Sequence, residues 1–139
     1  MYLSRLHISK FRVFDDITLY FKNGINILIG ENNSGKTAII DALRICLGCG
    51  KPDNFIYVQD GDLHVNPENP SEINTVIQFD LIFEFGDASI ERECFYDFIS
   101  QDKDNPDKQT IQLHLKFIQE NNGKKKYFKR IIWGGDNEV

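Results

Sequence analysis

The sequence lacks any long hydrophobic run, and its 139 residues include only three cysteines and four prolines. An odd number of cysteines cannot close a complete set of disulfides, and it is typical of proteins kept in a reducing compartment. Arg5, Lys10 and Arg12 interrupt the first apolar stretch, so neither a signal-peptide core nor a membrane-spanning segment is predicted. We therefore expect a cytoplasmic protein.

Positive charge is also scarce. Sixteen Lys and Arg against 21 Asp and Glu give a net charge of −5 and a pI near 5.1. This balance argues against a broad DNA-phosphate surface on this segment, so we expect DNA contacts through regions outside it. The basic run 124–126 has two interpretations: three solvated lysines that protect a hairpin edge, which we favour, or a small phosphate-contacting patch.

Hydrophobic residues are sufficient for a folded core. They make up 41% of the chain and include 11 Phe, while charged residues make up 27%. A chain of this length forms one domain that buries roughly two-thirds of its unfolded surface. A disordered segment or a multidomain protein is therefore not predicted.

The N-terminal third predicts strands. Apolar and polar residues alternate over 6–8 and 17–21, which indicates a hairpin with its turn near Phe14–Asp16. Asn23-Gly24 is a second turn signal. The following run, Ile25–Ile29, is apolar on both faces and predicts a central buried strand that ends at Gly30.

A helix is predicted over Lys36–Leu47, because apolar residues recur there at helical spacing and Gly48 supplies a stop signal. Cys46 and Cys49 form a C-x-x-C pair without a second ligand pair. We interpret them as a residue of the apolar helix face and one just past the helix end, rather than as a zinc or redox site. The stretch Gly48–Glu72 predicts a long loop.

The remaining residues predict three strands and one helix. Alternation marks strands over Ile77–Phe85 and Ile111–Phe117, and helical spacing marks Ile90–Ile99. Asn122-Gly123 predicts a hairpin turn, after which Tyr127–Trp133 returns antiparallel. No internal repeat accompanies this pattern.

The strongest functional signal is the segment Gly30–Thr37, which reads GENNSGKT and matches G-x-x-x-x-G-K-[ST]. A predicted strand precedes it and a predicted helix follows it, which is the context that a phosphate-binding loop requires. Four fixed positions match by chance in fewer than about one chain in a hundred of this length. The alternative is a glycine-rich turn with an incidental lysine.

The loop chemistry explains the spacing. Gly30 and Gly35 let the backbone curl so that N–H groups point at a β-phosphate, at the positive end of the following helix. Lys36 is placed to reach the β- and γ-phosphate oxygens as the catalytic cation, and the Thr37 hydroxyl to ligate Mg²⁺. The candidate nucleotide-binding residues are Gly30, Glu31, Asn32, Asn33, Ser34, Gly35, Lys36, Thr37 and Ala38. The predicted cofactors are ATP and Mg²⁺.

Hydrolysis also needs a carboxylate on a second strand and a group that orients water. Asp80 follows an apolar stretch, but the alternation continues to Phe85, so it is not a strand-terminal catalytic carboxylate. Gly134-Gly135 lacks the serine of a dimer-bridging LSGGQ-type loop. A small complete kinase would need several lid arginines, and only Arg92 and Arg130 lie beyond Arg44. We therefore expect the chain alone to be inactive in hydrolysis.

The arrangement resembles a known family. Ile8–Phe14, Gly24–Ile29, Gly30–Thr37 and Ala38–Leu43 are together similar to the amino-terminal lobe of ABC-type DNA-repair ATPases, which include the SMC and RecF-like proteins. The resemblance implies an α/β fold with α+β character, a P-loop NTPase lobe of ABC/SMC type. In it, an antiparallel β layer joins a partial mixed sheet and the P-loop helix.

Within that group, the OLD family of ATP-dependent endonucleases is the most similar. The resemblance lies in Glu31-Asn32-Asn33, in Asp62-Leu63-His64 followed by the strand Ile73–Phe85, and in the ending Arg130–Gly135. It implies a hydrolase linked to a DNA endonuclease in a longer protein. The alternative is a lobe of an SMC- or RecF-like clamp that grips DNA without cutting it.

The resemblance also implies partners and further site residues. ATP is sandwiched between two protomers of such ATPases, which implies a homodimer in the longer protein. Arg12 lies in a region near the nucleotide, so it is either a phosphate or adenine-side contact or a solvated arginine. Asn32 and Asn33 shape the loop. Gln59 follows the predicted helix so closely that we interpret it as an ordinary loop residue, not as the family's metal-contacting glutamine.

Several parts of the family's pattern have no counterpart in the sequence. They are the helical arms, the signature loop, the second Mg²⁺ carboxylate, the switch histidine and the Toprim nuclease domain. Residues 1–139 are therefore expected to form the amino-terminal portion of an ABC-type P-loop ATPase domain, without its Walker B strand.

Overall fold

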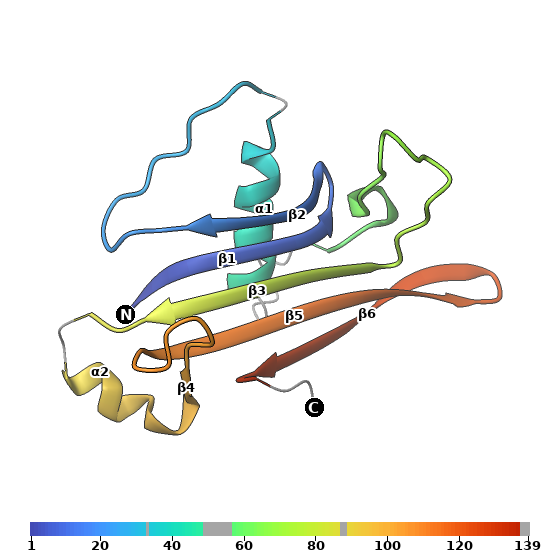
Figure 1. The fold of residues 1–139 in the computed structure, drawn as a ribbon. Helices are drawn as coiled ribbons and strands as arrows, with labels where there is room; N and C mark the ends of the chain where they lie inside the picture. The colour runs from blue at the N-terminus through green and yellow to red at the C-terminus, as the bar shows by residue number, and fades with distance from the viewer. Residues whose placement is uncertain (33, 49–56, 87–88, 137–139) are drawn as a thin grey trace.

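The computed structural model describes residues 1–32, 34–48, 57–86 and 89–136, and its main feature is one six-stranded sheet (Figure 1). The strands are β1 (Tyr2–Phe11), β2 (Phe14–Tyr20), β3 (Val76–Glu84), β4 (Ile99–Gln101), β5 (Gln109–Asn122) and β6 (Lys125–Gly134). The helices are α1 (Lys36–Leu47) and α2 (Ser89–Cys94), with 3₁₀ turns η2 (Asp60–Asp62) and η3 (Tyr96–Phe98).

The sheet has the strand order β2-β1-β3-β5-β4, and β6 pairs with β5. Each pairing among the described strands is antiparallel. The long hairpin β5–β6 therefore closes one side of the sheet, while the hairpin β1–β2 closes the other. This antiparallel layer confirms part of the predicted fold.

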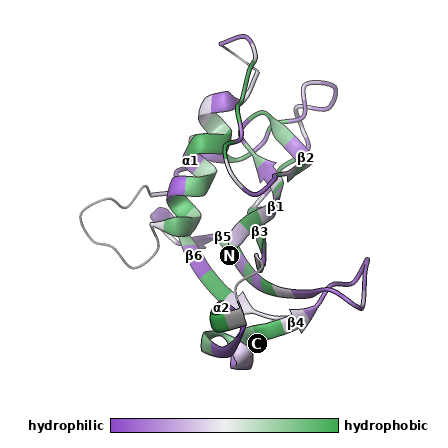
Figure 2. Ribbon diagram, turned by 90° about the vertical axis from the view of Figure 1, so that its left-hand side faces the viewer, coloured by the Kyte–Doolittle hydropathy of each residue, from purple (hydrophilic) through white to green (hydrophobic). Residues whose placement is uncertain are grey.

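The core lies between α1 and one face of the sheet (Figures 1 and 2). Alternate residues of β1, β3 and β5 point toward the helix, as the two-residue period requires. Phe79 is fully buried at the centre, where its ring meets Phe11 edge-on at 5.1 Å and Phe117 at 6.1 Å between centroids. The helix contributes the buried residues Ala38, Ile39, Ala42, Ile45 and Cys46.

The P-loop helix has the predicted bounds. It runs from Lys36 to Leu47, and the Gly48 N–H donates to the Arg44 carbonyl at 2.9 Å. Cys46 is 2% exposed on the apolar face, as predicted, while Cys49 lies outside the described residues. The predicted strands over 77–85, 111–117 and 127–133 are confirmed as β3, β5 and β6.

The N-terminal hairpin is confirmed, but its turn was predicted too late in the sequence. Phe11 pairs with Phe14, so the turn consists of Arg12 and Val13 rather than 14–16. Arg12 has a φ of +51°, a left-handed conformation that lets the chain reverse within two residues. A left-handed arginine gives no sequence signal, since glycine and asparagine are the usual residues there.

The prediction of a buried strand over Ile25–Ile29 is wrong. These residues belong to none of the described strands, and Ile25, Ile27 and Ile29 are 93%, 77% and 91% exposed. A run that is apolar on both faces is buried only where other segments cover both faces. None of the described strands pairs with this run, so its composition alone does not bury it.

The predicted helix over 90–99 is also wrong in length. The structure has α2 over Ser89–Cys94, the turn η3, and then β4, which begins at Ile99. Ile90 and Phe98 are 72% and 66% exposed, so the apolar spacing did not correspond to one buried helix face. Periodicity without burial does not sustain a helix.

The loop predicted over 48–72 is attached to the sheet through its second half; residues 49–56 lie outside the described residues. Leu63 forms an antiparallel bridge with Phe11, and the Arg12 N–H donates to the Asp62 carbonyl at 2.7 Å. The His64 N–H donates to the Lys10 carbonyl at 3.1 Å. These bonds hold Asp62-Leu63-His64 against the β1–β2 turn.

None of the described helices is long and apolar enough to cross a membrane.

Candidate nucleotide-binding site

The glycine-rich loop leads directly into α1. Gly30, Glu31, Asn32 and Ser34 are exposed, and Asn33 lies outside the described residues. The Ser34 N–H and the Ser34 hydroxyl both donate to the Glu31 carbonyl, at 3.1 and 2.6 Å. The loop is therefore a tight turn closed by its own serine.

The N-terminus of α1 is suited to an anion. Gly35 is the N-cap residue, no side chain caps the helix, and its first turn contains no acidic residue. The first N–H groups of a helix have no acceptor within the helix, and its dipole places partial positive charge there. The N–H groups of Lys36, Thr37 and Ala38 therefore form a set of donors for phosphate oxygens.

The two polar side chains of the motif lie at this end of the helix. The Lys36 ammonium contacts the Gly30 carbonyl, so the lysine side chain folds back over the phosphate-binding loop. Thr37 is exposed, whereas Ala38 is 4% exposed and packs in the core. Only the backbone of Ala38 is thus available to a nucleotide.

At each of the two motif glycines, an added Cβ would lie too close to a neighbouring side chain. A Cβ at Gly30 would lie 2.6 Å from the Ser34 Oγ. Gly35 has a φ of +99°, and a Cβ there would lie 2.4 Å from the Phe14 Cζ and 3.0 Å from the Val13 Cγ2. The β1–β2 turn therefore presses against the loop. Sequence reasoning missed Val13 and Phe14, which had no signal beyond their place beside the turn.

Arg12 joins three segments below the loop. Its Nε donates to Asp62 Oδ1 at 2.9 Å and its Nη1 donates to Asp41 Oδ2 at 2.6 Å. Asp41 is on α1 and Asp62 ends η2, so the guanidinium ties the helix and the 57–75 loop to the turn. A nucleotide contact by Arg12 stays a prediction, and any such contact has to compete with these two carboxylates. Gln59 caps η2, as fits a loop residue.

The arrangement fits a magnesium nucleotide. A triphosphate could be bound by the backbone N–H groups at the uncapped helix end and by Lys36. Thr37 offers one hydroxyl ligand for the magnesium ion. Within the described ranges, no group of three or more His, Cys, Asp and Glu side chains is gathered to hold a metal.

Asp80 is far from such a role, because it lies in the middle of β3 on the sheet face opposite α1. It accepts from His7 Nδ1 at 2.7 Å and from His114 Nδ1 at 2.5 Å. Burial raises the pKa of Asp80, but hydrogen bonds from His114, Gln78 and His7 outweigh burial and lower that pKa to about 2. The carboxylate is therefore ionised at neutral pH.

His7 is held as an imidazolium. Its Nδ1 faces Asp80 and its Nε2 faces Asp16 Oδ1 at 2.9 Å, and ionised carboxylates only accept hydrogen bonds. Both ring nitrogens must then carry protons. Burial lowers the pKa of His7, but the bonds to Asp80 and Asp16 raise it above its ordinary value.

We expect Asp80→Asn to lower the free energy of unfolding by about 2 kcal/mol at pH 6. The contribution of Asp80 is present above its unfolded pKa and is lost as pH falls from about 4 to about 2. That of His7 is present below pH 6.5 and is lost as pH rises through its raised pKa. Urea unfolding at several pH values measures the difference from wild type, which should be largest between pH 4 and 6.5.

The matched control is Asp97→Asn, which makes the same chemical change at an exposed carboxylate. It should change the free energy of unfolding by less than about 0.5 kcal/mol at every pH. A pH-independent loss in Asp80→Asn would contradict the ionic role of this network.

Comparison with known proteins places these features in a family. The AAA domain family matches residues 5–137. The RecF DNA replication and repair protein of Symbiobacterium thermophilum is 44% identical over 44 residues, which are 32% of this chain and 12% of that protein. The Rad50 DNA double-strand break repair ATPase of Thermoplasma volcanium is 40% identical over 47 residues, 34% of this chain and 5% of that protein.

The matched part of the chain thus spans only a small share of these relatives. A solved structure from work on ATP-driven dimerisation and DNA-stimulated activation of SMC ATPases has a TM-score of 0.63 at 16% identity. The alignment covers 100% of this chain and 72% of that structure, which shows the fold of an SMC-type P-loop ATPase lobe. Since the family match spans nearly all of the sequence, the chain belongs to the AAA domain family of ATPases.

Proposed function

We propose that this chain is the ATP-binding lobe of a DNA-repair ATPase similar to RecF, Rad50 and SMC proteins. The observation that carries the proposal is the start of α1, where left-handed Gly35 turns the loop into an uncapped helix end next to Lys36. Two relatives that are 44% and 40% identical over 44 and 47 residues are themselves named as DNA-repair proteins.

In this proposal, the residues of the loop have different roles in binding Mg-ATP. The backbone N–H groups from 35 to 38 hold the β-phosphate, and Lys36 leaves the Gly30 carbonyl to bind β- and γ-phosphate oxygens. Thr37 orients the magnesium ion. Bound Mg-ATP supplies a hydrolysable γ-phosphoryl group, and the chain itself contributes binding and orientation.

A second protomer is proposed to complete the hydrolytic site. Asp80 lies in the middle of β3 on the face opposite α1, and Glu84, at the end of β3, forms an ion pair with Lys108. The SMC neighbour comes from work on ATP-driven dimerisation, which supports a homodimer in the longer protein. We expect that protein to act in the cytoplasm and to bind DNA.

The finer proposal is an OLD-like ATP-dependent endonuclease. It is supported by the sequence resemblance at Glu31-Asn32-Asn33 and at Asp62-Leu63-His64. Of these residues, Leu63 forms a bridge with Phe11 beside the β1–β2 turn. The second candidate is a clamp that grips DNA without cutting it, and the names of the RecF and Rad50 relatives, which give roles in DNA repair, fit it as well. ATP-dependent cleavage of plasmid DNA by the full-length gene product would decide for the endonuclease, and ATP-dependent binding without cleavage for the clamp.

The magnesium role is tested with Thr37→Ala. We expect wild type to bind ATP more tightly with Mg²⁺ than with EDTA, by roughly tenfold, because the Thr37 hydroxyl would help to hold an ion that offsets the phosphate charge. The variant should show less of this difference. Calorimetric titration with and without Mg²⁺ measures it.

Thr75→Ala is the matched control, since Thr75 is exposed and far along the chain from the loop. It should keep the wild-type response to Mg²⁺. Absence of any ATP binding by the wild-type chain, with or without Mg²⁺, would contradict the proposed site.

A further inference from the structure

The β5–β6 hairpin carries a charge opposite to that of the rest of the chain. Its residues 109–134 contain six Lys and Arg against one Glu, a net charge of +5. The rest of the sequence contains ten Lys and Arg against 20 Asp and Glu, a net charge of −10. The overall value of −5 thus averages over a strongly basic ribbon in an acidic protein.

Four of these cations are free to meet a partner. Lys124, Lys125, Lys126 and Lys129 are exposed, and in the part of the chain that the structure describes none has a carboxylate within 4.0 Å. Outside the hairpin, Arg5, Lys10 and Lys108 are examples of cations that form ion pairs within the fold. The hairpin lysines are therefore not needed to balance charges of the fold.

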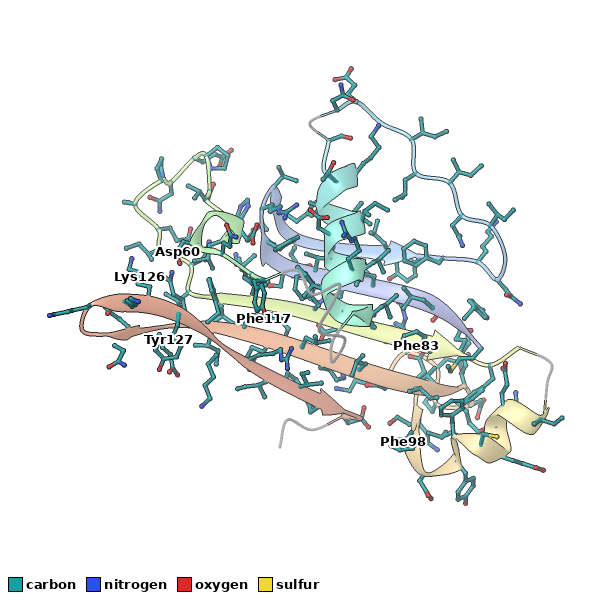
Figure 3. All side chains as sticks on the ribbon, turned by 180° about the vertical axis from the view of Figure 1, so that it is seen from behind. Asp60, Phe83, Phe98, Phe117, Lys126 and Tyr127 are labelled. Atoms are coloured by element: carbon teal, nitrogen blue, oxygen red, sulfur yellow. The ribbon has the colours of Figure 1, made fainter. Side chains whose placement is uncertain are left out.

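The hairpin end projects from the sheet. β3 pairs with β5 only as far as Ile118, so the hairpin beyond it has no strand neighbour on that side (Figure 1). Figure 3 shows Lys126 and Tyr127 near this free end. β6 pairs only with β5 among the described strands, which leaves its outer edge open. A large partner can approach the ribbon from its tip and its edge.

The lysines are ordered along the ribbon. Lys125 and Lys129 pair with Asn122 and Ile118, which places both on the sheet face opposite α1. Four residues of strand separate them by about 13 Å. On the α1 side, Asp60 accepts from Gln119 at 2.6 Å, so that side of the ribbon carries an acidic neighbour. On the opposite face Lys116, Lys125 and Lys129 accompany one carboxylate of the hairpin, that of Glu120, so this face of the ribbon is net positive.

We propose that this face of the β5–β6 hairpin binds the phosphate backbone of duplex DNA; the choice of DNA rests on the proposed function. Duplex DNA carries one negative charge per about 1.7 Å of axis, so a ribbon with cations about 13 Å apart meets several phosphates. The acidic remainder of the chain repels DNA elsewhere and confines the contact to the hairpin.

A duplex fits better than a single strand. Non-specific binding of single strands relies on aromatic rings that stack with bases. The Trp133 ring on this face already stacks on His114 at 5.1 Å, and the Lys116 ammonium lies 5.5 Å from its centroid. The Tyr127 hydroxyl donates to Glu120 at 2.6 Å. The lysines are therefore the groups that this face offers, and they recognise phosphate.

The test is fluorescence-anisotropy titration of a labelled 20-base-pair duplex with the 139-residue chain at several salt concentrations. Lys125→Gln/Lys129→Gln is compared with Lys22→Gln/Lys103→Gln, which removes the same charge from exposed lysines outside the hairpin. We expect the hairpin variant to lower the salt slope by about 0.9 per lost contact, which corresponds to roughly sixtyfold weaker binding at about 0.1 M salt. The control should bind within about twofold of wild type.

Two further binding measurements separate the hairpin proposal from the proposed ATP site. Lys36→Ala should keep DNA binding, while the hairpin variant should keep ATP binding, so failure of one proposal leaves the other standing. Equal loss in both double variants, tighter binding of single-stranded DNA, or no duplex binding by wild type at low salt would each overturn the hairpin proposal. So would unchanged DNA binding with increased self-association, which would assign the lysines to protection of the β6 edge.

Discussion

Lys36→Ala is expected to abolish tight ATP binding. The ammonium is placed to make two charged hydrogen bonds with β- and γ-phosphate oxygens, and each is worth about 1.5–3 kcal/mol. Losing both corresponds to a dissociation constant raised by more than about a hundredfold. Calorimetric titration of Mg-ATP into the purified chain measures this change.

The same substitution should leave the fold intact. In this structure the Lys36 ammonium contacts the Gly30 carbonyl at the exposed loop, so we expect the free energy of unfolding to change by less than about 0.5 kcal/mol. Lys22→Ala is the control for removal of an exposed lysine outside the loop. Undiminished ATP affinity in Lys36→Ala would show that the loop is a glycine-rich turn with an incidental lysine.

The local part of this site could be predicted from the sequence. The motif Gly30–Thr37 and the helix Lys36–Leu47 depend on residues that are close in the chain: glycines that permit a turn, apolar residues at helical spacing, and Gly48 as a stop. The strands β3 and β5 alternate over most of their length, so β3 was predicted to within one residue at each end, whereas β5 extends to Asn122, beyond the predicted end at Phe117. Signals of this kind need no knowledge of the partner segments.

The contacts that surround the loop could not be predicted. Arg12 meets Asp41 and Asp62, which lie 29 and 50 residues away in the sequence, and no local pattern reports such a meeting. The run Ile25–Ile29 failed for the same reason, since burial depends on what covers a segment and not on its composition alone. The positive charge of the β5–β6 hairpin is present in the sequence, but the net charge of the whole chain does not reveal it.

Gly35→Ala is expected to damage both the fold and the site. At a φ of +99°, an alanine carries a strain of roughly 1–2 kcal/mol. Its Cβ would also lie 2.4 Å from the Phe14 Cζ, so the turn or the loop has to move. We expect the free energy of unfolding to fall by more than about 2 kcal/mol. Mg-ATP binding should weaken by roughly a hundredfold as the backbone donors lose their alignment.

Two variants separate backbone strain from the contact with the turn. Gly24 has a similar φ of +108°, but a Cβ added there would meet nothing within 4 Å, so Gly24→Ala should cost only the strain and leave ATP binding unchanged. In Phe14→Ala/Gly35→Ala the colliding ring is absent. The double variant should therefore be more stable than the sum of its single changes implies, a coupling of roughly 1 kcal/mol or more. Strict additivity would mean that Phe14 does not position the loop, and that Gly35 is required for its backbone conformation alone.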